Sequence, residues 1–195
     1  MNQMNQMNQT TIAADARHAR WLKQYYFARA AFSAAWMLSA FAAGAQTTAA
    51  ALLLLAYPLW DALANLLDAR RSGGLAANRP QALNVIASLG ATVAVTVPLG
   101  QALPDMHQVL AVFGAWAIVS GVLQLATGVR RWKTAGAQWA MVLSGAQSAL
   151  AGGYFIAQSS LAAEPSVATL AGYAGFGALY FLLSGLALQV KSRRR

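Results

Sequence analysis

The sequence predicts an all-α integral membrane protein that crosses the bilayer six times. Of its 195 residues, 58% are hydrophobic and only 10% are charged, whereas a soluble domain carries about 25% charged residues. The apolar residues gather in six runs, and each run is close to the roughly 20 residues that a helix needs to cross the hydrocarbon core. Basic residues flank these runs, so the net charge of +9 indicates membrane flanks and not a nucleic-acid partner.

Residues 1–24 form the first of two predicted regions. The repeat MNQMNQMNQ has nothing to bury and is expected to be disordered. The basic segment that follows either lies at the headgroup level, with Arg17, Arg20 and Lys23 facing anionic lipid, or is a solvated lead-in. The sequence around Gly44 resembles a signal-peptide cleavage site, but the apolar run before it is long, begins late and contains Arg29. We therefore expect an uncleaved span.

Residues 25–195 are expected to form one transmembrane domain. Small residues recur at every fourth place of the first span and predict a close helix contact there; they are Ala31, Ala35, Ser39 and Ala43. Basic clusters recur roughly every 60 residues and divide the chain into three helical hairpins, which are interpreted as diverged repeats. The six spans are predicted at residues 25–44, 47–67, 82–103, 108–129, 136–157 and 167–190.

The distribution of charge predicts that both termini are cytoplasmic. With the N-terminus inside, every Lys and Arg falls on the inner side, and the turns near Gln46, Asp105 and Ser160 are periplasmic. These outer turns carry His107, interpreted either as an acid sensor or as an ordinary turn residue. The 14 basic residues are Arg17, Arg20, Lys23, Arg29, Arg70, Arg71, Arg79, Arg130, Arg131, Lys133, Lys191, Arg193, Arg194 and Arg195.

Asp61 is the residue that most needs an explanation, because a carboxylate inside a membrane costs several kcal/mol unless it is neutral or paired. Asn65 and Asp68 follow it at i+4 and i+7, on the same helix face. One interpretation is a site for proton relay or solute coordination. The favoured interpretation is an ion pair between Asp61 and Arg29 of the first span, with Asp68 as a helix cap.

The fourth and fifth spans carry the clearest packing pattern. Glycines spaced by seven residues face small residues of the next span, which predicts a close-packed seam. Gln124 and Gln147 are predicted to form a hydrogen bond across the same hairpin. There is no cysteine and no catalytic or nucleotide-binding motif in a suitable context, so no catalytic residue, cofactor or metal site is expected. The seam residues are Gly114, Gly121, Gly128, Ser144, Ser148 and Gly152.

The stretch FGAWAIVSGVLQLATGVRRWKTAGAQWAMVLSGAQSALAGG at residues 113–153 resembles the HdeD-like acid-resistance membrane proteins of bacteria. The resemblance is best over residues 109–153, is weaker over 172–188, and does not extend to the first two spans. It implies a bacterial inner-membrane protein linked to stress or acid tolerance, with no catalytic residues. We therefore expect a non-enzymatic protein that assembles with itself or a partner. The alternative is a small transporter or proton-linked channel that uses Asp61 and Asn65.

Overall fold

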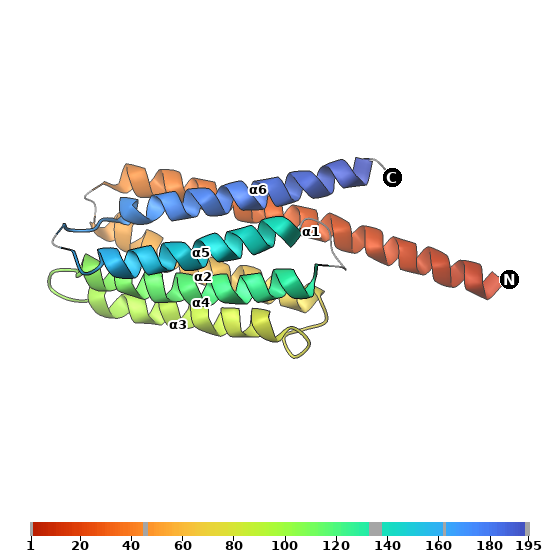
Figure 1. The fold of residues 1–195 in the computed structure, drawn as a ribbon, viewed down its shortest axis with the longest axis horizontal. Coiled ribbons are helices and arrows are strands. Elements are labelled where there is room, and N and C mark those ends of the chain that lie inside the picture. Colours follow the sequence, from red (N-terminus) through yellow and green to blue (C-terminus); the bar gives the residue numbers. More distant parts are fainter. Residues whose placement is uncertain (1, 45–46, 133–137, 162, 194–195) are drawn as a thin grey trace.

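The computed structural model describes residues 2–44, 47–132, 138–161 and 163–193, and no strand occurs among them. Six long helices lie side by side and are joined by short loops (Figure 1). A short 3-10 helix, η1 (Val167–Leu170), precedes the last of them. The helices are α1 (Asn2–Ala43), α2 (Thr47–Arg71), α3 (Arg79–Leu99), α4 (Met106–Arg130), α5 (Gln138–Gln158) and α6 (Ala171–Arg193).

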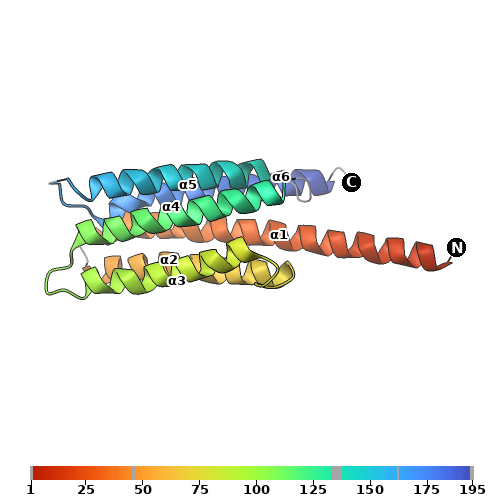
Figure 2. The ribbon, with the colours of Figure 1, turned by 60° about the horizontal axis from the view of Figure 1, so that its bottom comes forward.

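The helices form a closed ring, because each helix contacts the next in the chain and α6 returns to contact α1 (Figures 1 and 2). The most extensive contacts are α4 with α5, α1 with α6, and α2 with α3. This differs from the three consecutive hairpins expected from the sequence, since α1 packs more closely on α6 than on α2. Glycines of α6 explain the difference: a Cβ added at Gly185 would lie 3.0 Å from the Phe27 ring, and one at Gly175 would lie 2.7 Å from the Met37 sulfur.

Helix α1 differs from its sequence prediction in two respects. It begins at Asn2 and extends beyond the bundle (Figure 1), so residues 2–11 are helical where the polar repeat was predicted to be disordered. A helix that is already formed lengthens at little cost, because each added residue contributes one hydrogen bond. Second, Ala31, Ala35 and Ser39 are exposed. The large side chains of Tyr26 and Trp36 occupy the inner face of α1 instead, with exposures of 1% and 3%.

Four segments of the described chain are long and apolar enough to cross a membrane: Thr47–Arg71, Arg79–Leu99, Met106–Arg130 and Val167–Arg193. Large apolar side chains such as Ile86, Val93 and Leu150 lie exposed on the outside of the ring. Such a surface is suited to contact with lipid acyl chains and not with water. The fold is therefore that of an all-α, multi-pass membrane protein.

The two ends of the bundle differ in charge. One end carries both termini, the α2–α3 loop and the end of α4 (Figure 1), and with them the described basic residues of these segments. Lys133, Arg194 and Arg195 lie outside the described residues. At the opposite end, His107 of α4 contacts the α5–α6 loop: Nδ1 lies 3.2 Å from the Ser159 carbonyl and Nε2 lies 3.1 Å from the Glu164 carboxylate.

Candidate functional site: a polar cavity inside the helix ring

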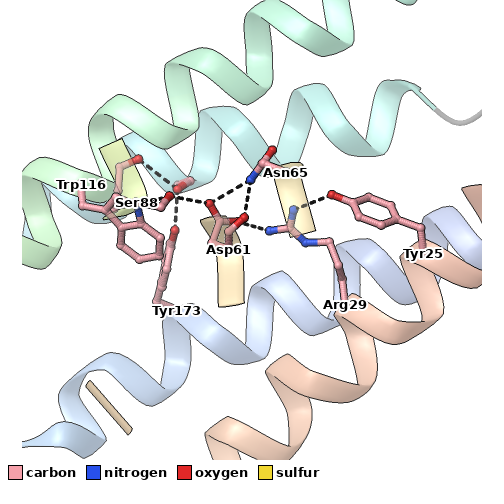
Figure 3. Close-up of polar contacts among 9 residues, drawn as sticks. Tyr25, Arg29, Asp61, Asn65, Ser88, Trp116 and Tyr173 are labelled. Carbon is pink, nitrogen blue, oxygen red and sulfur yellow. Dashed lines mark hydrogen bonds and ion pairs between the residues drawn. The ribbon is translucent and has the colours of Figure 1, made fainter. Parts of the chain in front are cut away.

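An ion pair between α1 and α2 lies at the centre of the site. The Arg29 guanidinium donates from Nη2 to Oδ1 of Asp61 and from Nη1 to the Tyr25 hydroxyl, the latter over 2.9 Å (Figure 3). The two charged side chains are only 13% and 10% exposed. The guanidinium also lies over the Phe181 ring of α6, 4.3 Å from its centroid. Arg29 therefore contacts three elements of the ring through its head group.

The other oxygen of Asp61 extends the network to α3 and α4. Asn65 Nδ2 lies 3.0 Å from Oδ2 of Asp61 and 2.8 Å from its backbone carbonyl, to which it also donates. Ser88 of α3 donates its hydroxyl to Oδ2 over 2.9 Å, and Trp116 of α4 donates its indole N–H to Ser88 over 2.9 Å (Figure 3). The hydrogen bonds that begin at the Asp61 carboxylate therefore link α1, α2, α3 and α4, and both of its oxygens accept hydrogen bonds.

The ion pair forms part of the wall of a cavity of about 40 Å³. A water molecule needs roughly 10–15 Å³, so the cavity has room for about three. All six helices contribute to its lining, with polar side chains in the majority. The lining residues are Arg29, Ser33, Tyr57, Trp60, Asp61, Asn84, Trp116, Ser120, Gln124, Ser144, Gln147, Ser148, Tyr173, Gly177 and Phe181.

Five buried polar atoms of residues in the wall of this cavity have no hydrogen-bond partner among the described residues. They are Nε of Arg29, Nε1 of Trp60, Oδ1 of Asn84, Oγ of Ser120 and Nε2 of Gln124. Because a buried polar atom without a partner costs about 1–3 kcal/mol, these atoms indicate a hydrated interior. The sequence predicted a hydrogen bond between Gln124 and Gln147; both line the cavity, but Nε2 of Gln124 does not make that bond.

A second ion pair lies nearer the basic end of the bundle. Arg131, just after α4, donates from Nη1 to Oδ2 of Asp68 over 3.1 Å, and Gln81 of α3 donates to the same oxygen over 3.3 Å. Asp68 is only 4% exposed. The sequence suggested a helix cap for this residue, but the structure places it inside the ring, because the helix face that it shares with Asp61 and Asn65 points inward.

The predicted seam lies between α4 and α5. A Cβ added at Gly121 would lie 2.6 Å from the Gly145 carbonyl oxygen and 2.7 Å from the Ala149 nitrogen, and one at Gly114 would lie 2.8 Å from the Gly152 carbonyl oxygen. At Gly128 the nearest atom, a methyl of Val142, would be 2.9 Å away. The backbones therefore approach more closely than any larger residue allows.

The two serines of the seam face the interior. Ser144 lines the central cavity. Ser148 donates to the Ala117 carbonyl of α4 over 3.1 Å and lies 2.8 Å from the Tyr173 hydroxyl of α6. Ser148 therefore connects α4 and α5, which form the seam, to α6. Its small size alone did not predict this contact.

The structure brings Arg29, Asp61 and Asn65 together, whereas sequence analysis did not identify Ser88 as part of the network. One pattern could have found it: Asn84 and Ser88 are polar residues four apart in a mostly apolar span, so they share a helix face. No comparable pattern indicated Trp116 or Tyr173, since aromatic residues are common in spans for packing reasons alone.

Comparison with known proteins adds one region of similarity to this multi-pass membrane fold. Residues 106–157 match the family described as "Short repeat of unknown function (DUF308)". The matched region comprises α4, the α4–α5 connection and nearly all of α5, and so contains the glycine seam. Searches of the curated proteins and of the solved structures found no match.

Proposed function

We propose that the chain is a six-span protein of a bacterial inner membrane, with both termini in the cytoplasm. Helices α1 and α5 pack within the same closed ring as the four segments that are long and apolar enough to span. Apart from Arg29 in the wall of the central cavity, the described basic residues, from Arg17 to Arg193, lie at or beyond one end of that ring, and positively charged flanks face the cytoplasm in membrane proteins. These two observations support six spans and an inward orientation of the basic end.

Within this topology we propose a non-enzymatic role in stress or acid tolerance. The short-repeat match at residues 106–157 supports it, together with the resemblance of that region to HdeD-like proteins. The observation that supports a non-catalytic role is that the interior carboxylates are already paired: Asp61 binds Arg29 of α1, and Asp68 binds Arg131 just after α4. Carboxylates held in this way join helices to one another and stabilise the ring.

The experiment for this role is the survival of a deletion strain after acid exposure. The strain is complemented with the wild-type chain or with the Gly121→Leu variant, which disrupts the seam, and Gly153→Leu serves as the control because a Cβ there meets nothing within 4 Å. We expect rescue by the wild type and by the control only. Equal survival of the parent and the deletion strain would overturn the stress role.

The surface of the protein supports two proposed partners, anionic lipid and a second copy of the chain. The basic end is suited to anionic lipid headgroups, and Arg71 lies over the Trp21 ring there, 4.8 Å from its centroid, an arrangement suited to a membrane interface. The exposed small residues Ala31, Ala35 and Ser39 of α1 offer a surface on which a second copy can pack closely. We propose a homo-oligomer through this face, to be checked by crosslinking at Ala35→Cys in the membrane.

A second candidate function is a small transporter or proton-linked channel. The specific observation in its favour is that Asp61 and Arg29 line a cavity bounded by all six helices, since transporters bind their coupling ions at charged or polar sites between helices. Proteoliposomes with an entrapped pH-sensitive dye test it. The wild type should dissipate a pH gradient faster than empty liposomes do, and Asp61→Asn should abolish the difference, whereas Thr96→Ala on the exposed face of α3 should retain it.

A further inference from the structure

The central cavity continues toward the basic end of the ring. A second hollow of about 20 Å³ lies between α1, α2, α3, α4, α5 and α6 at that end. Four residues line both spaces, namely Arg29, Asn84, Gln124 and Phe181. The second hollow is bounded by Pro80 in the first turn of α3, so the two spaces follow each other from the middle of the ring to its basic end.

The unpaired polar atoms follow the same direction. Oγ of Ser120 and Nε2 of Gln124 lie one turn apart on α4, and Oδ1 of Asn84 faces both spaces from α3. Oδ1 of Asp68, in the wall of the second hollow, also has no hydrogen-bond partner among the residues that the structure describes. Each of these atoms lacks a partner among the described residues, and a water molecule would supply one.

Toward the end of the ring opposite the basic end, apolar side chains close the central cavity. We define the outer apolar layer as Leu54, Tyr57, Leu110, Phe113, Trp116 and Val167, all of which belong to one core cluster and are at most 9% exposed. Tyr57 and Trp116 form part of the wall of the central cavity, whereas Leu54 and Val167 line a separate open hollow of about 440 Å³ at the end of the bundle opposite the basic end. The layer therefore separates the two spaces.

We propose that the central cavity is a water site that fills from the cytoplasmic, basic end and is sealed from the periplasm by the outer apolar layer. The inference deepens the second candidate function, because it names solvent as the occupant of the Asp61 site and gives the side from which it enters. The proposed orientation decides which end is called cytoplasmic and which periplasmic. The lining residues alone show that the cavity continues toward one end and is closed by apolar side chains toward the other.

Cysteine accessibility tests the proposal without background, since the chain has no cysteine of its own. Ser120→Cys places a thiol in the cavity, and Val122→Cys, on the exposed face of the same helix, serves as the lipid-facing control. Membranes are treated with Ag⁺, which is small and binds thiolates. The protein is then denatured, and the remaining free thiols are labelled with a fluorescent maleimide. Inverted vesicles expose the cytoplasmic side, and spheroplasts expose the periplasmic side.

We expect Ag⁺ to block Ser120→Cys at least about tenfold faster than Val122→Cys in inverted vesicles, and to block it slowly in spheroplasts. Leu110→Cys, in the outer apolar layer, should remain unblocked in inverted vesicles. If Ser120→Cys does not fold, Thr127→Cys in the second hollow replaces it. Equal slow blocking of the cavity and lipid-facing variants, or faster blocking from the periplasmic side, would overturn the proposal.

The outcomes separate this inference from the transport function. Blocking of Ser120→Cys with no flux in liposomes would retain the water site and exclude the channel. Flux with no blocking of Ser120→Cys would retain transport and exclude this cavity as its route. The two measurements therefore fail independently.

Discussion

The hydroxyl oxygen of Ser88 lies 2.9 Å from Oδ2 of Asp61 and donates a hydrogen bond to it. The other oxygen of the same carboxylate, Oδ1, pairs with Arg29 of α1. Ser88 is fully buried. It also accepts the indole N–H of Trp116, and one small side chain therefore connects an acid of α2 to an aromatic residue of α4. The network therefore depends on Ser88, a small and uncharged side chain.

The first prediction concerns this residue. Ser88→Ala removes one donor from Asp61 and leaves the indole N–H of Trp116 without its acceptor, so we expect the free energy of unfolding to fall by about 1–3 kcal/mol. Thr96→Ala on the same helix is the matched control, because the Thr96 hydroxyl is exposed and bonds only to the Val93 carbonyl of its own helix. It should change stability by less than about 0.5 kcal/mol. Denaturation in mixed detergent micelles measures both.

The second prediction concerns the seam between α4 and α5. An added methyl group at Gly121 would lie 2.6 Å from the Gly145 carbonyl oxygen, which is backbone and cannot move aside alone. Gly121→Ala should therefore cost about 1–3 kcal/mol, and Gly121→Leu or Ser144→Leu should disrupt folding. Gly153→Ala is the control, since the added group meets nothing within 4 Å, and Leu123→Phe should also be tolerated. Similar detergent stability of Gly121→Ala and Gly153→Ala would contradict a close-packed seam.

The amount that could be predicted from the sequence differs between contacts. Arg29 and Asp61 could be matched because each is a lone charge in an apolar span and both enter from the same side. Arg131 could not be assigned to Asp68 in this way, because it belongs to a basic cluster in which each basic residue is equally suited to flank a membrane span. The structure distinguishes them by burial: Arg130 is exposed, whereas Arg131 bonds to Asp68.

The packing of α1 shows a second limit. Its small residues suggested which face contacts another helix, but Ala31 and Ala35 are exposed and the Trp36 face is inside. Small residues allow close approach without requiring it, whereas Trp36 donates its indole N–H to the Leu53 carbonyl of α2 over 2.7 Å. A tertiary hydrogen bond of this kind depends on the partner helix, which local spacing does not specify.

The third prediction follows from the contrast between the adjacent arginines. Arg131→Ala leaves the buried Asp68 carboxylate with Gln81 as a weaker donor, so we expect a loss of about 1–3 kcal/mol. Arg130→Ala removes the same charge from the same membrane flank and should cost less than about 0.5 kcal/mol. Equal stability of the two variants would show that the contact of Arg131 with Asp68 does not hold α4 to α2.

The fourth prediction concerns orientation. A phosphatase that is active only in the periplasm should be inactive when fused after Arg193 and active when fused after Pro104, because the described basic residues lie at the end of the bundle that carries Arg193. A fluorescent protein that matures only in the cytoplasm should give the reciprocal pattern. Phosphatase activity from the C-terminal fusion would reverse the proposed topology.

The last prediction separates the structural and transport roles of the Arg29–Asp61 pair. Asp61→Ala leaves a cation near the membrane interior and Arg29→Ala leaves an acid there, so each single change should cost about 3–5 kcal/mol. The double change should recover part of that loss, since removing both partners leaves no buried charge. A double-mutant cycle without coupling would show that the pair contributes nothing to the stability of the ring.

Asp61→Asn then distinguishes the two roles, because the amide removes the charge but keeps the shape of the side chain. Its single oxygen can accept either from Arg29, at the position of Oδ1, or from Asn65 and Ser88, at the position of Oδ2. If the pair only joins helices, this variant should lose less stability than Asp61→Ala and should support acid survival as the wild type does. If Asp61 also serves proton or solute movement, liposome flux should be abolished while most of the stability remains. Wild-type flux from Asp61→Asn would exclude a transport role that depends on the charge of this carboxylate.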